Sequence, residues 1–283
     1  ASFVGGDVSP DGCGHISDWD VSRVTTLSQV FKDLSSFNEN ISAWNTARVT
    51  SLYQTFRGAR AFNGDLSLWN TASVTALYDT FFQATNFNGD ISNWNIESVT
   101  WLGGTFNQAR NFNRDLSMWN VAKVTYMGGM FSQSDRFDGY NISSWNVNKV
   151  SSMTGTFENA ASISDCIKAA IFKRWKTNSN FLIAYDEAWG NTKCATISDY
   201  LSAFKGAKCG YGTTSCTCTY IGDVDISCTP NCGTIPSALG DCAELVQLNM
   251  TSSSANGGVV VGTIPTELGR LAQLQVLDLG RSS

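Results

Sequence analysis

The segment ISAWNTARVTSLYQTFRGARAFNGD (residues 41–65) is followed directly by LSLWNTASVTALYDTFFQATNFNGD (residues 66–90). The second segment keeps the same residue as the first, or one of the same kind, at most positions along a period of 25 residues. Self-similarity at a fixed period is typical of proteins in which one unit cannot bury its apolar side chains alone and must stack on its neighbours. The sequence therefore predicts a solenoid.

Six copies of this repeat align on columns of apolar residues. Tryptophan recurs with a spacing of 25 residues four times and then of 26, where Tyr140 is the inserted residue. The columns are Trp19, Trp44, Trp69, Trp94, Trp119 and Trp145; Val24, Val49, Val74, Val99, Val124 and Val150; and Phe31, Phe56, Phe81, Phe106, Phe131 and Phe157. A further aromatic column contains Phe37, Phe62, Phe87, Phe112 and Phe137 and ends with Ile163. Such regular columns favour a packed core over a cofactor-binding or sugar-binding site.

The pattern inside one repeat changes its period. Ile41, Trp44 and Thr46 suit a short strand. The residues that follow recur every three or four positions, which places them on one side of a short helix: Val49, Leu52, Phe56 and Ala59. Thr50 is in a position to cap that helix. We therefore expect an α/β solenoid, a right-handed leucine-rich-repeat-like array with a parallel sheet.

The composition excludes several classes of protein. Hydrophobic residues make up 42% of the 283 residues, so the chain is not disordered by composition. The net charge of −5 argues against a nucleic-acid partner, because such surfaces are basic. No apolar run approaches the roughly 18 residues of a membrane span, so we expect no membrane insertion within the chain. Ala1 does not begin a secretion signal, and we expect a mature form.

The cysteine pattern indicates an oxidising compartment. Eight of the nine cysteines are crowded into one segment: Cys166, Cys194, Cys209, Cys216, Cys218, Cys228, Cys232 and Cys242. A zinc site is the alternative, but the spacings fit it poorly and no histidine lies nearby. We expect disulfides, and hence a secreted or cell-surface protein.

Cys13 stands apart from this group. It precedes the first repeat, whereas Cys166 follows the sixth, so five repeats separate the two by about 24 Å. A disulfide needs Cα atoms within about 7 Å of one another. Cys13 is therefore free, bonded to an unpaired partner in a cap that folds far back, or bonded to another chain as an intermolecular thiol.

Three sequons predict N-linked glycosylation, at Asn40, Asn141 and Asn249. Asn40 and Asn141 share one repeat position, at which the other repeats carry Asp65, Asp90 and Asp115. A column of aspartates can recruit Ca²⁺, but capping of a turn by each aspartate is the favoured interpretation. We expect no other cofactor.

A binding patch is predicted where the repeats differ. Four aromatic residues lie beside the core positions and should face outward: Tyr53, Tyr78, Trp101 and Tyr126. An exposed aromatic row can stack on sugar rings or on another protein. The alternative is a partly covered flank that only contacts adjacent repeats.

WNVAKVTYMGGMF (residues 119–131) and FNGDISNWN (residues 87–95) resemble the BspA-like leucine-rich-repeat surface proteins, and this resemblance covers residues 16–163. CIKAAIFKRWKTNSNFLIAYDEAWGNTKC (residues 166–194) is similar to the Cys-bounded helical segment that often closes such arrays. The resemblance implies a leucine-rich-repeat fold, a Cys166–Cys194 disulfide, and a surface or secreted location with adhesion proposed for some members.

GTIPSALGDCAELVQLNM and GTIPTELGRLAQLQVLDL, from Gly233 and Gly262, resemble two plant-type leucine-rich repeats. Together the two resemblances imply an N-terminal cap segment (1–15), six repeats (16–163), a Cys-rich helical cap or linker (164–232) and a second short array (233–283).

Enzymatic activity is not expected. The chain has one histidine, His15, and no nucleophile motif or phosphate loop. Its pattern-breaking acids are scattered over several columns: Glu39, Asp79, Glu97, Asp135 and Glu158.

We expect a non-enzymatic extracellular structural or adhesive repeat glycoprotein, whose open C-terminal repeat and Cys13 permit head-to-tail assembly into a fibre. The alternative is a ligand- or glycan-binding ectodomain of a leucine-rich-repeat receptor or adhesin. The expected partners are other copies of the chain, other surface proteins, or glycans.

Overall fold

The computed structural model describes residues 14–139, 142–192, 222–228, 245–252 and 276–278. Its elements are the 3-10 helices η1 (Ile16–Asp18) and η2 (Ile142–Ser144), the helices α1 (Asp165–Trp175) and α2 (Ser179–Trp189), and the strands β1 (Gly222–Cys228), β2 (Leu245–Ser252) and β3 (Val276–Asp278). The chain forms two compact units. One contains the repeats and Arg174–Asp186, and the other contains Ser164–Lys173 and the described residues from Glu187 onward.

The predicted fold class, a right-handed α/β solenoid with a leucine-rich-repeat-like parallel sheet, is wrong. Within the described residues of the six repeats there is neither an α-helix nor a β-strand. The segments expected to be strand and helix consist instead of turns, two 3-10 helices and single parallel bridges. The strands β1 to β3 belong to the other unit.

Backbone hydrogen bonds explain why the spacing of three and four residues did not produce a helix. In the second repeat, the N–H groups of Leu52, Gln54 and Phe56 donate to carbonyl oxygens of the third repeat, at 3.1, 3.0 and 2.9 Å. The intervening N–H groups of Thr55 and Arg57 donate to carbonyl oxygens three residues back, at 3.2 Å. A helix would direct all of these groups four residues back along its own axis. The backbone instead alternates between tight turns and bonds to the next repeat.

Two left-handed positions in every repeat interrupt the extended backbone, because a positive φ is incompatible with a strand. The first column contains Gln29, Gln54, Asp79, Gly104, Gly129 and Gly155, and the second contains Asp33, Gly58, Gln83, Gln108, Gln133 and Asn159. Pairing between successive repeats is therefore limited to isolated parallel bridges, such as those that join Ser51 to Ala76 and Trp101 to Tyr126.

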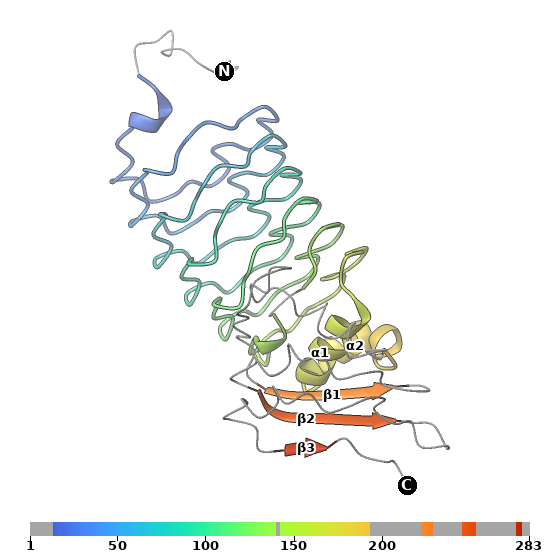
Figure 1. Cartoon of the computed structure of the whole chain (residues 1–283). Helices are drawn as coiled ribbons and strands as arrows, with labels where there is room; N and C mark the ends of the chain where they lie inside the picture. The colour runs from blue at the N-terminus through green and yellow to red at the C-terminus, as the bar shows by residue number, and fades with distance from the viewer. Residues whose placement is uncertain (1–13, 140–141, 193–221, 229–244, 253–275, 279–283) are drawn as a thin grey trace, which may run out of the picture. The chain divides into compact units, whose positions relative to one another are not determined.

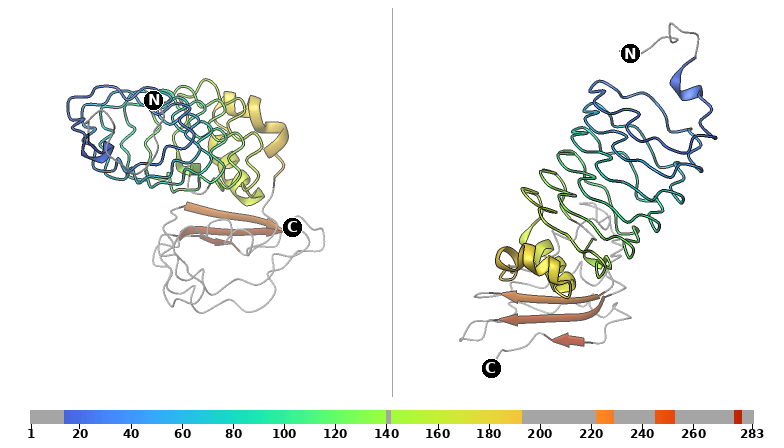
Figure 2. Two further views of the ribbon diagram at one scale, coloured as in Figure 1. Left: turned by 90° about the horizontal axis from the view of Figure 1, so that it is seen from above. Right: turned by 180° about the vertical axis from the view of Figure 1, so that it is seen from behind.

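The repeats are stacked one after another along a common axis (Figure 1), and the view from behind shows the same order (Figure 2). Aromatic columns fill the interior of the stack. The indoles of Trp44 and Trp69 have centroids 6.4 Å apart with planes 3° apart, and the rings of Phe56 and Phe81 are 5.4 Å and 1° apart. These side chains are at most 4% exposed. The regular columns thus form the core, as predicted.

Polar side chains also bond from repeat to repeat. The indole N–H of Trp69 donates to the carbonyl oxygen of Ile41 at 3.1 Å, and Trp44, Trp94, Trp119 and Trp145 donate the equivalent bond. The hydroxyl of Thr50 donates to the carbonyl oxygen of Thr25 at 3.0 Å, so it links two repeats and does not cap a helix. Each bond satisfies a group that the stack would otherwise leave without a partner.

Trp175, at the end of α1, covers the sixth repeat. Its indole stacks on Trp145 with centroids 6.3 Å apart and planes 13° apart, close to the geometry between Trp119 and Trp145. Trp175 therefore occupies the place that the tryptophan of a seventh repeat would take. It is 1% exposed.

Asn178, the residue before α2, closes the exposed backbone of the same repeat. Its amide nitrogen donates to the carbonyl oxygens of Val147 and Val150, at 2.7 and 2.9 Å. Its side-chain oxygen accepts the N–H of Phe181 at 3.2 Å and so caps α2. The repeat stack thus ends in a built cap.

The sheet of the second unit has the order β1-β2-β3 with parallel pairing, and Val224 pairs with Leu248, which pairs with Leu277 (Figure 1). Residues 193–221 and 229–232 of the Cys-rich segment and most of residues 233–283 lie outside the described residues, and the plant-type repeats are not confirmed. No helix within the described ranges has both the length and the apolar character needed to span a membrane.

Candidate functional site

The structure brings the four residues of the predicted patch together in one row across four repeats. Ring centroids are 5.8 Å apart between Tyr53 and Tyr78, 6.2 Å between Tyr78 and Trp101, and 5.4 Å between Trp101 and Tyr126. We refer to these four residues as the aromatic strip. Its role in binding stays a prediction.

The strip changes column halfway along its length. Tyr53 and Tyr78 share one repeat position, whereas Trp101 and Tyr126 stand two residues earlier in their repeats. Each ring is paired with a small residue at the other position: Ser51, Ala76, Gly103 and Gly128. The row of rings thus stays continuous although no single column is aromatic throughout.

The two glycines are required by the ring of Tyr126. A Cβ atom on Gly103 would collide with the ring of Tyr126 and would lie 3.2 Å from the ring of Tyr78. A Cβ atom on Gly128 would lie 2.6 Å from the phenolic oxygen of Tyr126. Tyr126 therefore lies over bare backbone of the fourth and fifth repeats.

Trp101 has a different orientation from the rest of the strip. The rings of Tyr53 and Tyr78 are stacked with planes 14° apart, so each covers a face of the other. The indole of Trp101 is turned by 61° relative to Tyr78, and the residue is 51% exposed. The three tyrosines are only partly exposed. Trp101 is therefore the ring of the strip that solvent reaches most freely.

A buried carboxylate holds the backbone beside Tyr78. Asp79 is 6% exposed, and its Oδ2 accepts from Arg57 Nη1 at 2.7 Å and from Gln54 Nε2 at 3.2 Å. The guanidinium of Arg57 also lies 4.1 Å from the ring centroid of Phe82. Burial raises the pKa of Asp79 despite the hydrogen bond from Gln54 and the charge of Arg57, and the charge of Asp79 raises the pKa of Tyr78.

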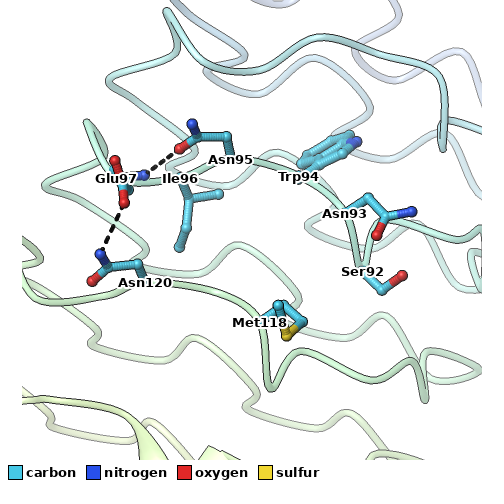
Figure 3. A pocket seen from close by; sticks show the side chains of 8 residues that line it. All are labelled: Ser92, Asn93, Trp94, Asn95, Ile96, Glu97, Met118 and Asn120. Atoms are coloured by element: carbon cyan, nitrogen blue, oxygen red, sulfur yellow. Dashed lines mark hydrogen bonds between the residues drawn. The ribbon is translucent and has the colours of Figure 1, made fainter.

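A shallow hollow between the fourth and fifth repeats is a second candidate surface (Figure 3). Glu97 Oε1 accepts from the amide nitrogen of Asn120 at 3.2 Å on one side. Asn93 and Met118 lie on the other side, and Met118 is 79% exposed. The sequence interpretation noted Glu97 only as a scattered acid and missed the hollow. The available signal was that Asn93, Glu97 and Met118 all differ from the residues at the same positions in neighbouring repeats.

The aspartate column consists of turn caps. Asp65, Asp90 and Asp115 each accept the backbone N–H of the serine two residues later, at 2.9, 3.0 and 2.8 Å. The hydrogen bonds from Ser92 lower the pKa of Asp90. This confirms the favoured interpretation of the column. Among the described residues, no group of three or more His, Cys, Asp and Glu side chains is placed to hold a metal ion.

Asn40 is the glycosylation candidate that the structure describes most fully. The residue is exposed, and its Oδ1 accepts from the N–H and the hydroxyl of Ser42, at 3.1 and 2.8 Å. Asn249 belongs to β2, and Asn141 lies outside the described residues. Whether any of the three carries a glycan stays a prediction.

Cys166 is disulfide-bonded. Its implied partner, Cys194, lies outside the described residues, so the implied pairing stays a prediction. Cys228 belongs to β1. The remaining predicted cysteines also lie outside the described residues: Cys13, Cys209, Cys216, Cys218, Cys232 and Cys242.

Two overlapping stretches of the chain, residues 9–102 and 67–170, match one family, described as "Mycoplasma protein of unknown function, DUF285". They span all six repeats and more than half of the chain, and neither reaches the predicted plant-type repeats at 233–283. A comparison with curated proteins finds no match. On the strength of its repeats, the chain belongs to the DUF285 family.

Proposed function

We propose that this chain is a non-enzymatic, extracellular adhesive repeat protein that contacts other molecules through the aromatic strip. The observation that carries the proposal is the strip itself. The interior of the stack is already filled by the Trp and Phe columns, for example by Phe81, Phe106 and Trp94, which are at most 2% exposed. Trp101 and its neighbours add a row of large rings on the outside, where they are not needed to complete the core.

Three further features support an extracellular location. The repeats belong to DUF285 and resemble BspA-like surface proteins. Cys166 is disulfide-bonded, which is typical of an oxidising compartment. Asn40 presents an exposed sequon. The expected partners are surface glycans, other surface proteins or further copies of this chain.

Adhesion can be measured with beads that carry the full chain. The beads are counted after washing on surfaces coated with mucin, with cellulose, with chitin and with the chain itself. We expect retention on at least one coat, and a strong loss of retention for the Tyr78→Ala and Trp101→Ala variants, because each removes a ring from the strip. Leu68→Ala is the matched control, since Leu68 is 74% exposed and lies outside the strip.

Near-UV circular dichroism checks that each variant keeps the packed tryptophan columns. The proposal is wrong if both strip variants are folded and are retained as well as the wild-type chain. It is also wrong if Leu68→Ala reduces retention as much as Trp101→Ala does, since the contact would then not depend on the strip.

A further inference from the structure

The proposed function leaves the chemistry of the ligand open, and the surroundings of Trp101 restrict it. An aromatic ring has a negative face and attracts weakly positive C–H groups. The indole of Trp101 is turned out of the tyrosine stack and is half exposed, so it offers such a face more freely than Tyr53 or Tyr78. Pyranose sugars with equatorial hydroxyls present flat arrays of axial C–H groups that fit this surface.

The hydroxyl of Thr100, the residue before Trp101, differs in its hydrogen bonding from the equivalent hydroxyls of other repeats. Thr50, Thr75 and Thr125 donate their hydroxyls to the carbonyl oxygen of the preceding repeat, at 3.0, 3.2 and 3.2 Å. Thr100 occupies the same column and is exposed, yet its hydroxyl forms no hydrogen bond within the described part of the chain. It can therefore donate to a ligand and accept from it.

The charge at one repeat position, a few residues before the strip in sequence, also changes in the third and fourth repeats. The column before the core valine is basic at both ends of the stack, with Arg23, Arg48, Lys123 and Lys149. Serine replaces the basic residue only at Ser73 and Ser98, in the two repeats that carry Tyr78 and Trp101. An anionic polymer would gain from basic residues here, because charge-assisted bonds are the stronger ones. Their replacement by hydroxyls favours an uncharged ligand.

We propose that Trp101, together with its near neighbours in the chain, Thr100 and Ser98, binds an uncharged pyranose glycan. The sugar ring packs on the indole, and its hydroxyl groups pair with the hydroxyl of Thr100. Ring centroids 5.4–6.2 Å apart are comparable to the length of one sugar unit, so Tyr78 and Tyr126 flank the adjacent units of the same glycan chain. This inference rests on the proposed use of the strip and names its ligand class.

The test is calorimetric titration of the full chain with chitohexaose, cellohexaose and a heparin hexasaccharide, each to millimolar concentration. We expect binding of at least one of the two neutral sugars and weaker or no binding of heparin. Trp101→Ala should weaken binding roughly tenfold or more, whereas Trp101→Phe should keep most of it because it retains a ring. Thr100→Val should weaken binding severalfold without a change in thermal stability, and Thr75→Val is the matched control.

The outcomes separate the two proposals. If neither neutral sugar binds while bead retention is still lost in Trp101→Ala, the strip is adhesive but the glycan inference is wrong. Tighter binding of heparin, or binding that Trp101→Ala leaves unchanged, also overturns the inference. If no sugar binds and Trp101→Ala beads are retained normally, both proposals fail.

Discussion

Asp79 shows how a single residue is fitted to the repeat. The two preceding positions of its left-handed column are Gln29 and Gln54, and their amides form a chain of hydrogen bonds, from Gln29 Nε2 to Gln54 Oε1 and from Gln54 Nε2 to Asp79 Oδ2. Gly104 follows Asp79 in the column, and a Cβ atom there would collide with the Asp79 carboxylate. The chain of amides therefore ends at Asp79, where Arg57 supplies a charge.

The buried carboxyl of Asp79 makes stability depend on pH. Burial raises its folded pKa above the usual value of 3.8. The carboxyl group therefore stabilises the folded state fully below pH 3.8, and this stabilisation is lost as the pH rises through the folded pKa. Compared with Asp79→Asn, the wild-type chain should therefore gain stability as the pH is lowered from 7 to 3. Urea unfolding of both proteins at several pH values measures the difference; a constant difference, or one of opposite sign, contradicts the prediction.

Gly103 and Gly104 are adjacent but have different roles. Gly104 has a φ of +59° and faces the Asp79 carboxylate, so Gly104→Ala should lower the free energy of unfolding by roughly 1–3 kcal/mol. Gly103 lies under the ring of Tyr126, so Gly103→Ala should displace that ring and weaken ligand retention at a smaller cost in stability. Urea unfolding and bead retention for the two variants test this contrast, which is refuted if Gly104→Ala is the milder change in stability.

At the scale of elements, the sequence predicted which side chains of the repeat are buried better than it predicted the backbone conformation. Apart from Trp19 in the first repeat, which is 39% exposed, the Trp and Phe columns are buried as expected, because a fixed period reports which residues meet their equivalents in the next repeat. The prediction of a helix was wrong because side-chain spacing does not reveal which carbonyl oxygens accept from the N–H groups of Leu52 and Gln54. The left-handed glutamines also lack a sequence signal, since this conformation is uncommon for residues other than glycine.

The candidate site, too, was predictable from the sequence only in part. The rings of the strip were identifiable because they break the repeat pattern next to core positions. The 61° turn of Trp101 was not, because it depends on how the neighbouring rings of Tyr78 and Tyr126 lie in three dimensions. The hollow beside Glu97 and Met118 was missed because its lining residues differ in chemical character and come from two repeats, so no single repeat position marks it.

The cap formed by α2 can be weakened through one hydroxyl. Tyr185 accepts the N–H of Phe157 at 2.9 Å, and burial raises the pKa of Tyr185 to about 12. Tyr185→Phe removes this acceptor from a buried donor and should cost about 1–3 kcal/mol at neutral pH. The wild-type advantage is present below pH 10 and should disappear as the pH rises toward 12, because the phenol deprotonates more readily in the unfolded chain. Urea unfolding at pH 7 and pH 11 measures it, and an advantage that grows with pH contradicts it.

At the scale of the whole molecule, the repeats act as interchangeable units. Each bonds to its immediate neighbours, so deletion of residues 66–90 joins Asp65 to Ile91 and keeps every column in register. We expect this variant to fold with packed tryptophans and a lower urea midpoint. Deletion of residues 66–85 removes 20 residues, shifts the columns, and should abolish the near-UV signal of the stack. Equal behaviour of the two deletions would rule out register as the determinant of folding.

The cap also bears on head-to-tail assembly. Trp175 and Asn178 already cover the sixth repeat, so another copy of the chain cannot continue the tryptophan column there. A fibre would need contacts elsewhere, such as the predicted open C-terminal repeat or a disulfide at Cys13, and Cys13 lies outside the described residues.

The bonding between repeats has a mechanical consequence for an adhesive protein. When a ligand pulls on the stack while the far end is anchored, the layers carry the load in series, and the outermost layer can peel away while the others stay closed. Each released layer of 25 residues adds roughly 85 Å of extended chain in exchange for about 5 Å of stack height. The stack can therefore absorb a sudden force by unfolding one layer after another, so that the chain lengthens while the ligand stays bound.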